Sequence, residues 1–180
     1  MHYRRLFGKK NRPFCAGKLQ CLMNEAGADV LLPKKRNYWI ETNYSQYVHA
    51  HHEIDLTTTR QIIAEKCPEY LAAYDASMKC TWGHRFNMFV MKREIADKYC
   101  AWLFDILFEL ERRLDISQYS KNDARVFGFV AERLLDPWLE TNKIKYAECP
   151  VWNLESQHWP KKIFNFLKRK FIGKSRSESV

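Results

Sequence analysis

The chain lacks several features that would place it at once in a familiar class of protein. It has only six glycines in 180 residues, and it contains no GxGxxG fingerprint, no P-loop and no nucleophile elbow. Its longest apolar stretch, Ala101 to Leu110, is interrupted by Asp105 and Glu109. Such a stretch is too short and too charged to cross a bilayer. We therefore expect any membrane contact to be peripheral.

The cysteine pattern does not predict a disulfide framework or a zinc site. The six cysteines, at positions 15, 21, 67, 80, 100 and 149, include no CxxC pair, and no secretory signal precedes them. This usage is typical of reduced thiols, and it predicts a cytoplasmic protein. With 46% hydrophobic residues, the chain can bury one core as a single domain.

Positive charge is abundant but unevenly placed. Residues 1–36 carry a net charge of +7 and residues 161–180 carry +6, which leaves −4 for the middle of a chain whose total is +9. Two basic ends favour two local anion sites over one uniform nucleic-acid surface, so nucleic acid is not the expected partner. A non-catalytic basic module that binds nucleic acid or anionic lipid remains the alternative function.

Hydrophobic periodicity predicts an α/β domain that is rich in helices and has few strands. The predicted strands are residues 29–33, 87–91 and 145–152. Four helices are predicted. The first runs from Asp55 or Thr57 to Lys66, and the second begins at Pro68. The third covers residues 94–113 and the fourth covers 122–135, after which Pro137 ends or kinks the helix. Residues 38–52 are predicted to form a loop over the site.

The C-terminal segment differs in composition from the domain over residues 1–158. Residues 159–172 place aromatic and aliphatic side chains on one helical face and lysines and an arginine around the other. This basic amphipathic pattern predicts that 159–171 bind an anionic membrane surface, although a helix docked on the domain has the same pattern. Residues 173–180 are predicted to be a disordered tail.

Three motifs together resemble a known family. They are HYRR at residues 2–5, FNMFVM at 86–91 and RVFGFVAERL at 125–134. In this order they resemble a bacterial capsular- and exopolysaccharide glycosyltransferase family catalogued as domain of unknown function 4422, over residues 2–153. The resemblance implies an incomplete, Rossmann-like glycosyltransferase domain of the A type. It also implies that a nucleotide-binding half is missing before HYRR. The chain alone is then expected to bind donor weakly and not to transfer sugar, and an inactive truncated product is a third possibility.

The donor is expected to bind near the start of the chain. Arg4 and Arg5 offer guanidinium groups that pair with diphosphate oxygens. The resemblance places His2 and Tyr3 close by, and Asn87 could reach a sugar hydroxyl or simply cap a strand. No Asp-x-Asp metal motif is present. Either a divalent metal such as Mg or Mn is held by the missing half, or arginines neutralise the leaving group.

Glu132 is the predicted catalytic base, and Gly128 would permit close approach of the acceptor. The plain alternative is that Glu132 pairs with Arg125 or Arg133 along one helix. Asp123 is the weaker catalytic candidate.

His51 and His52 are predicted to contact the acceptor from the loop, or to be ordinary polar loop residues. Their spacing suits a metal site poorly, so no metal ligands are assigned. The expected activity is transfer of a sugar from a nucleotide-diphosphate donor to a lipid-linked glycan in capsular or exopolysaccharide assembly. We expect it to take place at the inner face of the plasma membrane.

Overall fold

The computed structural model describes residues 4–154 and shows an α/β domain, as the sequence predicts. His2, Tyr3, the predicted amphipathic helix 159–172 and the tail 173–180 lie outside the described residues. The described helices are α1 (Ala16–Glu25), α2 (Asn43–Val48), α3 (Glu53–Lys66), α4 (Leu71–Lys79), α5 (Arg93–Arg113) and α6 (Val126–Thr141). The described strands are β1 (Arg5–Lys9), β2 (Arg12–Pro13), β3 (Val30–Pro33), β4 (Arg36–Asn37), β5 (Trp82–Gly83), β6 (Val90–Met91), β7 (Tyr146–Cys149) and β8 (Val151–Asn153).

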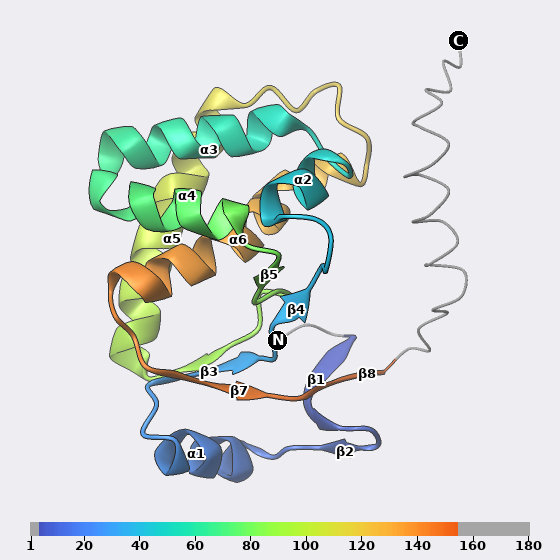
Figure 1. Ribbon diagram of the computed structural model, residues 1–180, viewed down its shortest axis with the longest axis vertical. Helices are drawn as coiled ribbons and strands as arrows, with labels where there is room; N and C mark the ends of the chain where they lie inside the picture. The colour runs from blue at the N-terminus through green and yellow to red at the C-terminus, as the bar shows by residue number, and fades with distance from the viewer. Residues whose placement is uncertain (1–3, 155–180) are drawn as a thin grey trace.

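Strand β3 lies at the centre of the domain. It pairs in parallel with β7 and antiparallel with β6. Because alternate side chains of a strand point to opposite faces, Val30 and Leu32 pack against the larger helical cluster while Leu31 packs toward α1. Helices α3 to α6 therefore cover one face of the sheet and α1 covers the other (Figure 1).

The last predicted strand is divided between two sheets. Over residues 145–152 the structure has β7 and then β8, with Pro150 between them. Strand β7 pairs with β3, whereas β8 pairs antiparallel with β1. The Pro150 carbonyl accepts a hydrogen bond of 2.8 Å from the Gly8 amide of β1. Proline cannot continue the ladder as a donor, and here it marks the point at which the chain changes partners.

The strongest helical prediction is confirmed by α5. Its core face consists of residues at helical spacing, namely Tyr99, Leu103, Ile106, Leu107 and Leu110. The predicted helix over 122–135 is shifted: α6 begins at Val126 after a 3-10 turn and continues past Pro137 to Thr141. Proline inside a helix costs about 3 kcal/mol. Burial of Trp138 and Leu139, at about 1.5–3 kcal/mol each, offsets this cost.

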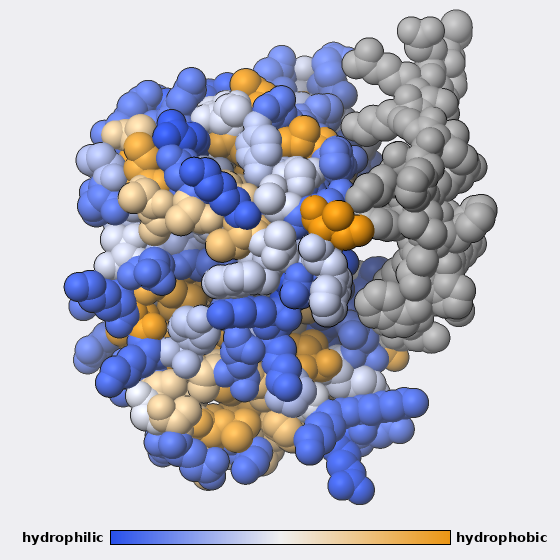
Figure 2. Space-filling view, in the orientation of Figure 1, coloured by the Kyte–Doolittle hydropathy of each residue, from blue (hydrophilic) through white to orange (hydrophobic). Residues whose placement is uncertain are grey.

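Two further predictions need correction. Residues 38–52 are not a plain loop, because they contain α2, which begins with a capping box between Thr42 and Ser45. The predicted strand 87–91 is reduced to β6, and Asn87 instead adopts a left-handed backbone with φ of 47°. Hydrophilic side chains cover most of the face in Figure 2, and the hydrophobic ones form separate patches.

Candidate functional site

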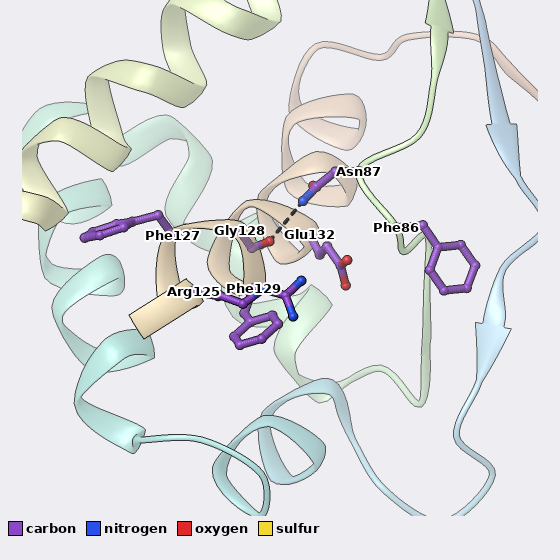
Figure 3. Close-up of a pocket in the computed structure, with 7 residues that line it drawn as sticks. All are labelled: Phe86, Asn87, Arg125, Phe127, Gly128, Phe129 and Glu132. Atoms are coloured by element: carbon purple, nitrogen blue, oxygen red, sulfur yellow. Dashed lines mark hydrogen bonds between the residues drawn. The ribbon is translucent and has the colours of Figure 1, made fainter. Parts of the chain in front are cut away.

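A pocket of about 420 Å³ opens between the start of α6 and the turn before β6 (Figure 3). Its lining residues are Phe86, Asn87, Arg125, Phe127, Gly128, Phe129 and Glu132. Three of these, Asn87, Gly128 and Glu132, are site residues predicted from the sequence. The structure therefore brings together candidates that are more than 40 positions apart in the chain.

The spacing of α6 explains the charged wall of this pocket. Arg125 immediately precedes α6 as its N-cap, and Gly128 and Glu132 follow it three and then four residues further on, so all three lie on the same side of the start of the helix. The Arg125 guanidinium and the Glu132 carboxylate point into the same space (Figure 3). Among residues 4–154, no ion pair joins Glu132 to Arg125 or to Arg133. The pocket thus presents a cation and a carboxylate side by side.

Gly128 leaves the floor of the pocket open. A Cβ built at this position would meet nothing within 4 Å, so the helix backbone is accessible there. The Gly128 carbonyl accepts a hydrogen bond of 3.0 Å from the Asn87 amide group. This bond holds Asn87 at the rim, with its side-chain oxygen available to a ligand.

The opposite wall is conformationally strained. Phe86 and Asn87 have successive positive φ values of 84° and 47°. Each such non-glycine residue costs about 1–3 kcal/mol, and residues of this kind concentrate at functional sites. The Arg5 guanidinium lies 4.0 Å from the centre of the Phe86 ring, and its Nε donates to Asn153. One predicted donor ligand therefore reaches this wall of the pocket, whereas Arg4 is exposed in the turn just before β1.

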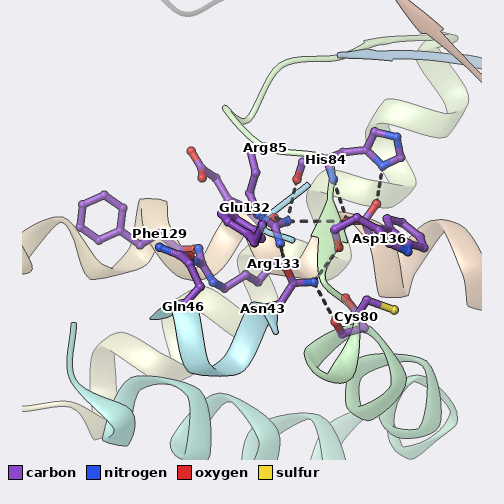
Figure 4. Close-up of polar contacts among 12 residues, drawn as sticks. Asn43, Gln46, Cys80, His84, Arg85, Phe129, Glu132, Arg133 and Asp136 are labelled. Carbon is purple, nitrogen blue, oxygen red and sulfur yellow. Dashed lines mark hydrogen bonds and ion pairs between the residues drawn. The ribbon is translucent and has the colours of Figure 1, made fainter. Parts of the chain in front are cut away.

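Beneath the pocket, the segment 84–87 is attached to α6 at intervals of one helical turn, through His84 and Arg85 (Figure 4) and through Asn87 (Figure 3). Its donors bond to acceptors at positions 136, 132 and 128: the His84 amide to Asp136, the Arg85 guanidinium to the Glu132 carbonyl, and the Asn87 side chain to the Gly128 carbonyl. Sequence reasoning did not identify Arg85 or Asp136, because neither lies in a recognisable catalytic pattern.

Arg85 is the centre of this attachment. Its side chain is buried and also donates to Tyr38 Oη, the His84 carbonyl and Asn43 Oδ1, while Asp136 lies 3.7 Å away as its counter-charge. Nearby, the buried Arg133 donates to the Phe129 carbonyl and to Gln46. Burial, followed by repulsion from Arg85, lowers the pKa of Arg133 to about 10.

The predicted loop histidines lie beside this pocket rather than in it. His51 Nδ1 is 3.1 Å from Asp123 Oδ1, and His52 Nε2 is 3.8 Å from the other oxygen of that carboxylate. The His51 ring stacks on Phe129, which lines the pocket, at 4.2 Å between ring centres. Hydrogen bonding from Ser120, then from His51, holds the pKa of Asp123 below its usual range. The cluster connects the α2–α3 corner to the turn before α6.

Within residues 4–154, no group of three or more His, Cys, Asp or Glu side chains is arranged to hold a metal ion. The sequence likewise contains no Asp-x-Asp motif. No step is therefore assigned to a metal held by these residues. The positively charged group that lines the pocket is Arg125. The sequence suggests Arg125 only as an ion-pair partner for Glu132.

The fold and the family of this chain can be compared with those of known proteins. The fold is similar to that of a bifunctional glycosyltransferase, WbbM, in its apo structure, with a TM-score of 0.72 and 26% sequence identity. The match covers 87% of this chain and 33% of that one, so the chain spans about a third of the length of WbbM. No curated protein matches. The model of the DUF4422 domain of unknown function matches residues 1–143, and the chain belongs to this family.

Because hydrogen bonds hold the buried Arg85 side chain in place, two glycine substitutions should differ in their effect on the free energy of unfolding. A Cβ on Gly83 would lie 2.4–2.6 Å from the Arg85 guanidinium atoms, which are held by several buried hydrogen bonds and cannot move aside freely. We expect Gly83→Ala to lower the free energy of unfolding by about 1–3 kcal/mol in denaturant titration. Gly17→Ala, in α1 with open space at its Cβ, is the control and should be neutral or slightly stabilising. Equal effects of the two substitutions would contradict the attachment.

The Asp123 cluster predicts a pH-dependent contribution to stability. Because the folded pKa of Asp123 is lowered, its stabilisation is fully present above the ordinary aspartate pKa and is lost as the pH falls through the folded value. Asp123→Asn should therefore be less stable than the unchanged chain at neutral pH, with the difference closing in acid. Asp97→Asn removes only an exposed pair with Arg93 and should show little difference at any pH. If the difference in unfolding free energy between Asp123→Asn and the unchanged chain stayed constant into acid, this explanation would be contradicted.

Proposed function

We propose that this chain carries part of the transfer site of a glycosyltransferase that moves a sugar from a nucleotide-diphosphate donor to a lipid-linked glycan in capsular or exopolysaccharide assembly. Membership of the DUF4422 family and the likeness to WbbM support the reaction class. The observation that carries the proposal is the pocket wall, where Arg125 and Glu132 flank the bare backbone of Gly128.

The chemistry follows from these groups for a transfer that inverts the anomeric carbon. The Glu132 carboxylate takes the proton from the acceptor hydroxyl as that oxygen bonds to the anomeric carbon. The bond between the anomeric carbon and the diphosphate oxygen breaks, and the nucleoside diphosphate leaves with the electron pair. Guanidinium groups of Arg125, Arg5 and Arg4 offset the charge that develops on the leaving group. His51, which stacks on Phe129, and the adjacent His52 are assigned to the acceptor side.

The acceptor places the reaction at a membrane. None of the described helices is long and apolar enough to span a bilayer. We assign attachment to residues 159–171, which lie outside the described residues and whose sequence combines a basic and an apolar face. In this proposal the protein works at the cytoplasmic face of the plasma membrane, where a lipid-linked glycan is within reach.

The role of Glu132 predicts a large and specific loss of turnover. In a form of the protein that transfers sugar, Glu132→Gln should lower kcat by about 10²–10⁴, the usual contribution of a general base, and keep donor affinity. Glu140→Gln, an exposed carboxylate on the same helix, is the matched control and should leave kcat unchanged. Near-normal turnover of Glu132→Gln, measured by release of nucleoside diphosphate, would remove Glu132 from the chemistry.

Donor binding should depend on Arg125 in the pocket and on Arg5 and Arg4 at the start of the chain. We expect Arg125→Gln, and separately Arg4→Ala with Arg5→Ala, to weaken binding of nucleotide-diphosphate sugars in calorimetry by about tenfold or more, because each removes charge-assisted bonds to phosphate. Arg112→Gln, whose charge pairs with Glu109 on α5, should bind as the unchanged chain does. An unchanged affinity in either test variant would exclude those arginines from the site.

A further inference from the structure

The loop between β4 and α2 exposes two large apolar side chains. Trp39 is 83% exposed and the adjacent Ile40 is 71% exposed, more than the other large hydrophobic residues of the described chain. A small hydrophobic patch stands out at the right-hand edge of the coloured surface in Figure 2, near the place where Figure 1 draws this loop. Contiguous exposed apolar patches mark sites of contact with another surface, whereas single exposed apolar residues are normal.

The backbone of this loop is held in place although its side chains face water. Trp39 has a positive φ of 62°, which is costly for a bulky residue. Its amide donates to Asn37 Oδ1 at 2.8 Å, and the Ile40 amide donates to the Tyr38 carbonyl at 2.7 Å. Tyr38 is itself anchored by the buried Arg85 guanidinium. The fold therefore fixes Trp39 and Ile40 in an outward position.

Positive charge surrounds the pair. Lys34 and Arg36 are exposed, and within residues 4–154 neither forms an ion pair. Lys35 lies over the Trp82 ring at 3.9 Å and is 4.0 Å from Glu148. The one acid next to the pair, Glu41, is turned to His49, and only 12% of its side chain is exposed. The surface thus combines an interfacial aromatic residue, an aliphatic residue and two cations, Lys34 and Arg36, that pair with no carboxylate of the described chain, although Arg36 also lies over the Tyr38 ring at 5.3 Å.

We propose that the segment 34–40 is a membrane-contact loop that inserts Trp39 and Ile40 between the headgroups of an anionic bilayer. Tryptophan favours the headgroup region because its ring is apolar and its N–H is polar. The cations on the preceding residues attract anionic lipid. This contact is separate from the proposed one at 159–171 and does not rest on sugar transfer. Through Tyr38 and Arg85 it would fix the orientation of the pocket relative to the membrane.

Vesicle sedimentation of the full chain tests this proposal. The probes are phosphatidylcholine vesicles with and without phosphatidylserine, at low and high salt. We expect Trp39→Ser with Ile40→Ser to weaken binding to the anionic vesicles by about tenfold or more. Lys34→Gln and Arg36→Gln should each weaken it about fivefold at low salt. The tail variant Lys168→Gln, Arg169→Gln, Lys170→Gln should act independently of both sets.

The matched control is Phe104→Ser with Phe108→Ser. These residues are an exposed apolar pair on α5 whose rings stack on each other, and α5 itself places Asp105 and Glu109 beside them. This variant should bind vesicles as the unchanged chain does. Unchanged binding of the Trp39 and Ile40 variant, or equal binding to vesicles without phosphatidylserine, would overturn the proposal. So would loss of self-association or of glycan binding in that variant with vesicle binding intact, since either result assigns the loop to a different partner.

Discussion

The burial of one guanidinium group, that of Arg85, determines how the candidate site is built. A buried cation must find acceptors, and Arg85 finds them on Asn43 at the start of α2, on Tyr38 of the exposed loop and on the carbonyl of Glu132 in α6. These contacts join the residues 38–43, the segment of Arg85 and α6, which are distant from one another in sequence. The strained turn at Phe86 and Asn87 follows directly and is thereby held against α6, which creates the wall of the pocket.

The pocket combines features that would each lower the stability of a fold if they served only packing. A carboxylate and a guanidinium face one cavity without pairing to each other, and a glycine in the helix leaves the space between them unfilled. Left-handed residues opposite them add strain. Each feature lowers stability on its own, so their coincidence at one place is better explained by binding than by packing. The large apolar cluster under α3 to α6 supplies the stability that such a site requires.

Much of the helical framework could be predicted from the sequence, because α5 and β3 have strong apolar patterns that packing follows directly. The spacing of Arg125, Gly128 and Glu132 also implied one helical face. The turn at Asn87 could not be predicted, since the Asn87 side chain donates its hydrogen bond to a carbonyl 41 positions away. The contact of His51 with Asp123, 72 positions apart, and the position of Arg85 likewise depend on tertiary packing that local pattern does not contain. The helix α1 was missed because it buries only Leu19 and Met23.

The central claim is that the pocket between Asn87 and Glu132 receives the nucleotide-sugar donor. Hydrogen exchange with a panel of nucleotide-diphosphate sugars tests it most directly, because exchange reports where a ligand protects the backbone. The account predicts that the effective donor slows exchange in residues 86–91 and 125–132, while the amides of α5 away from the pocket keep their rates. Protection confined to other segments, with those two unchanged at a saturating donor concentration, would contradict it.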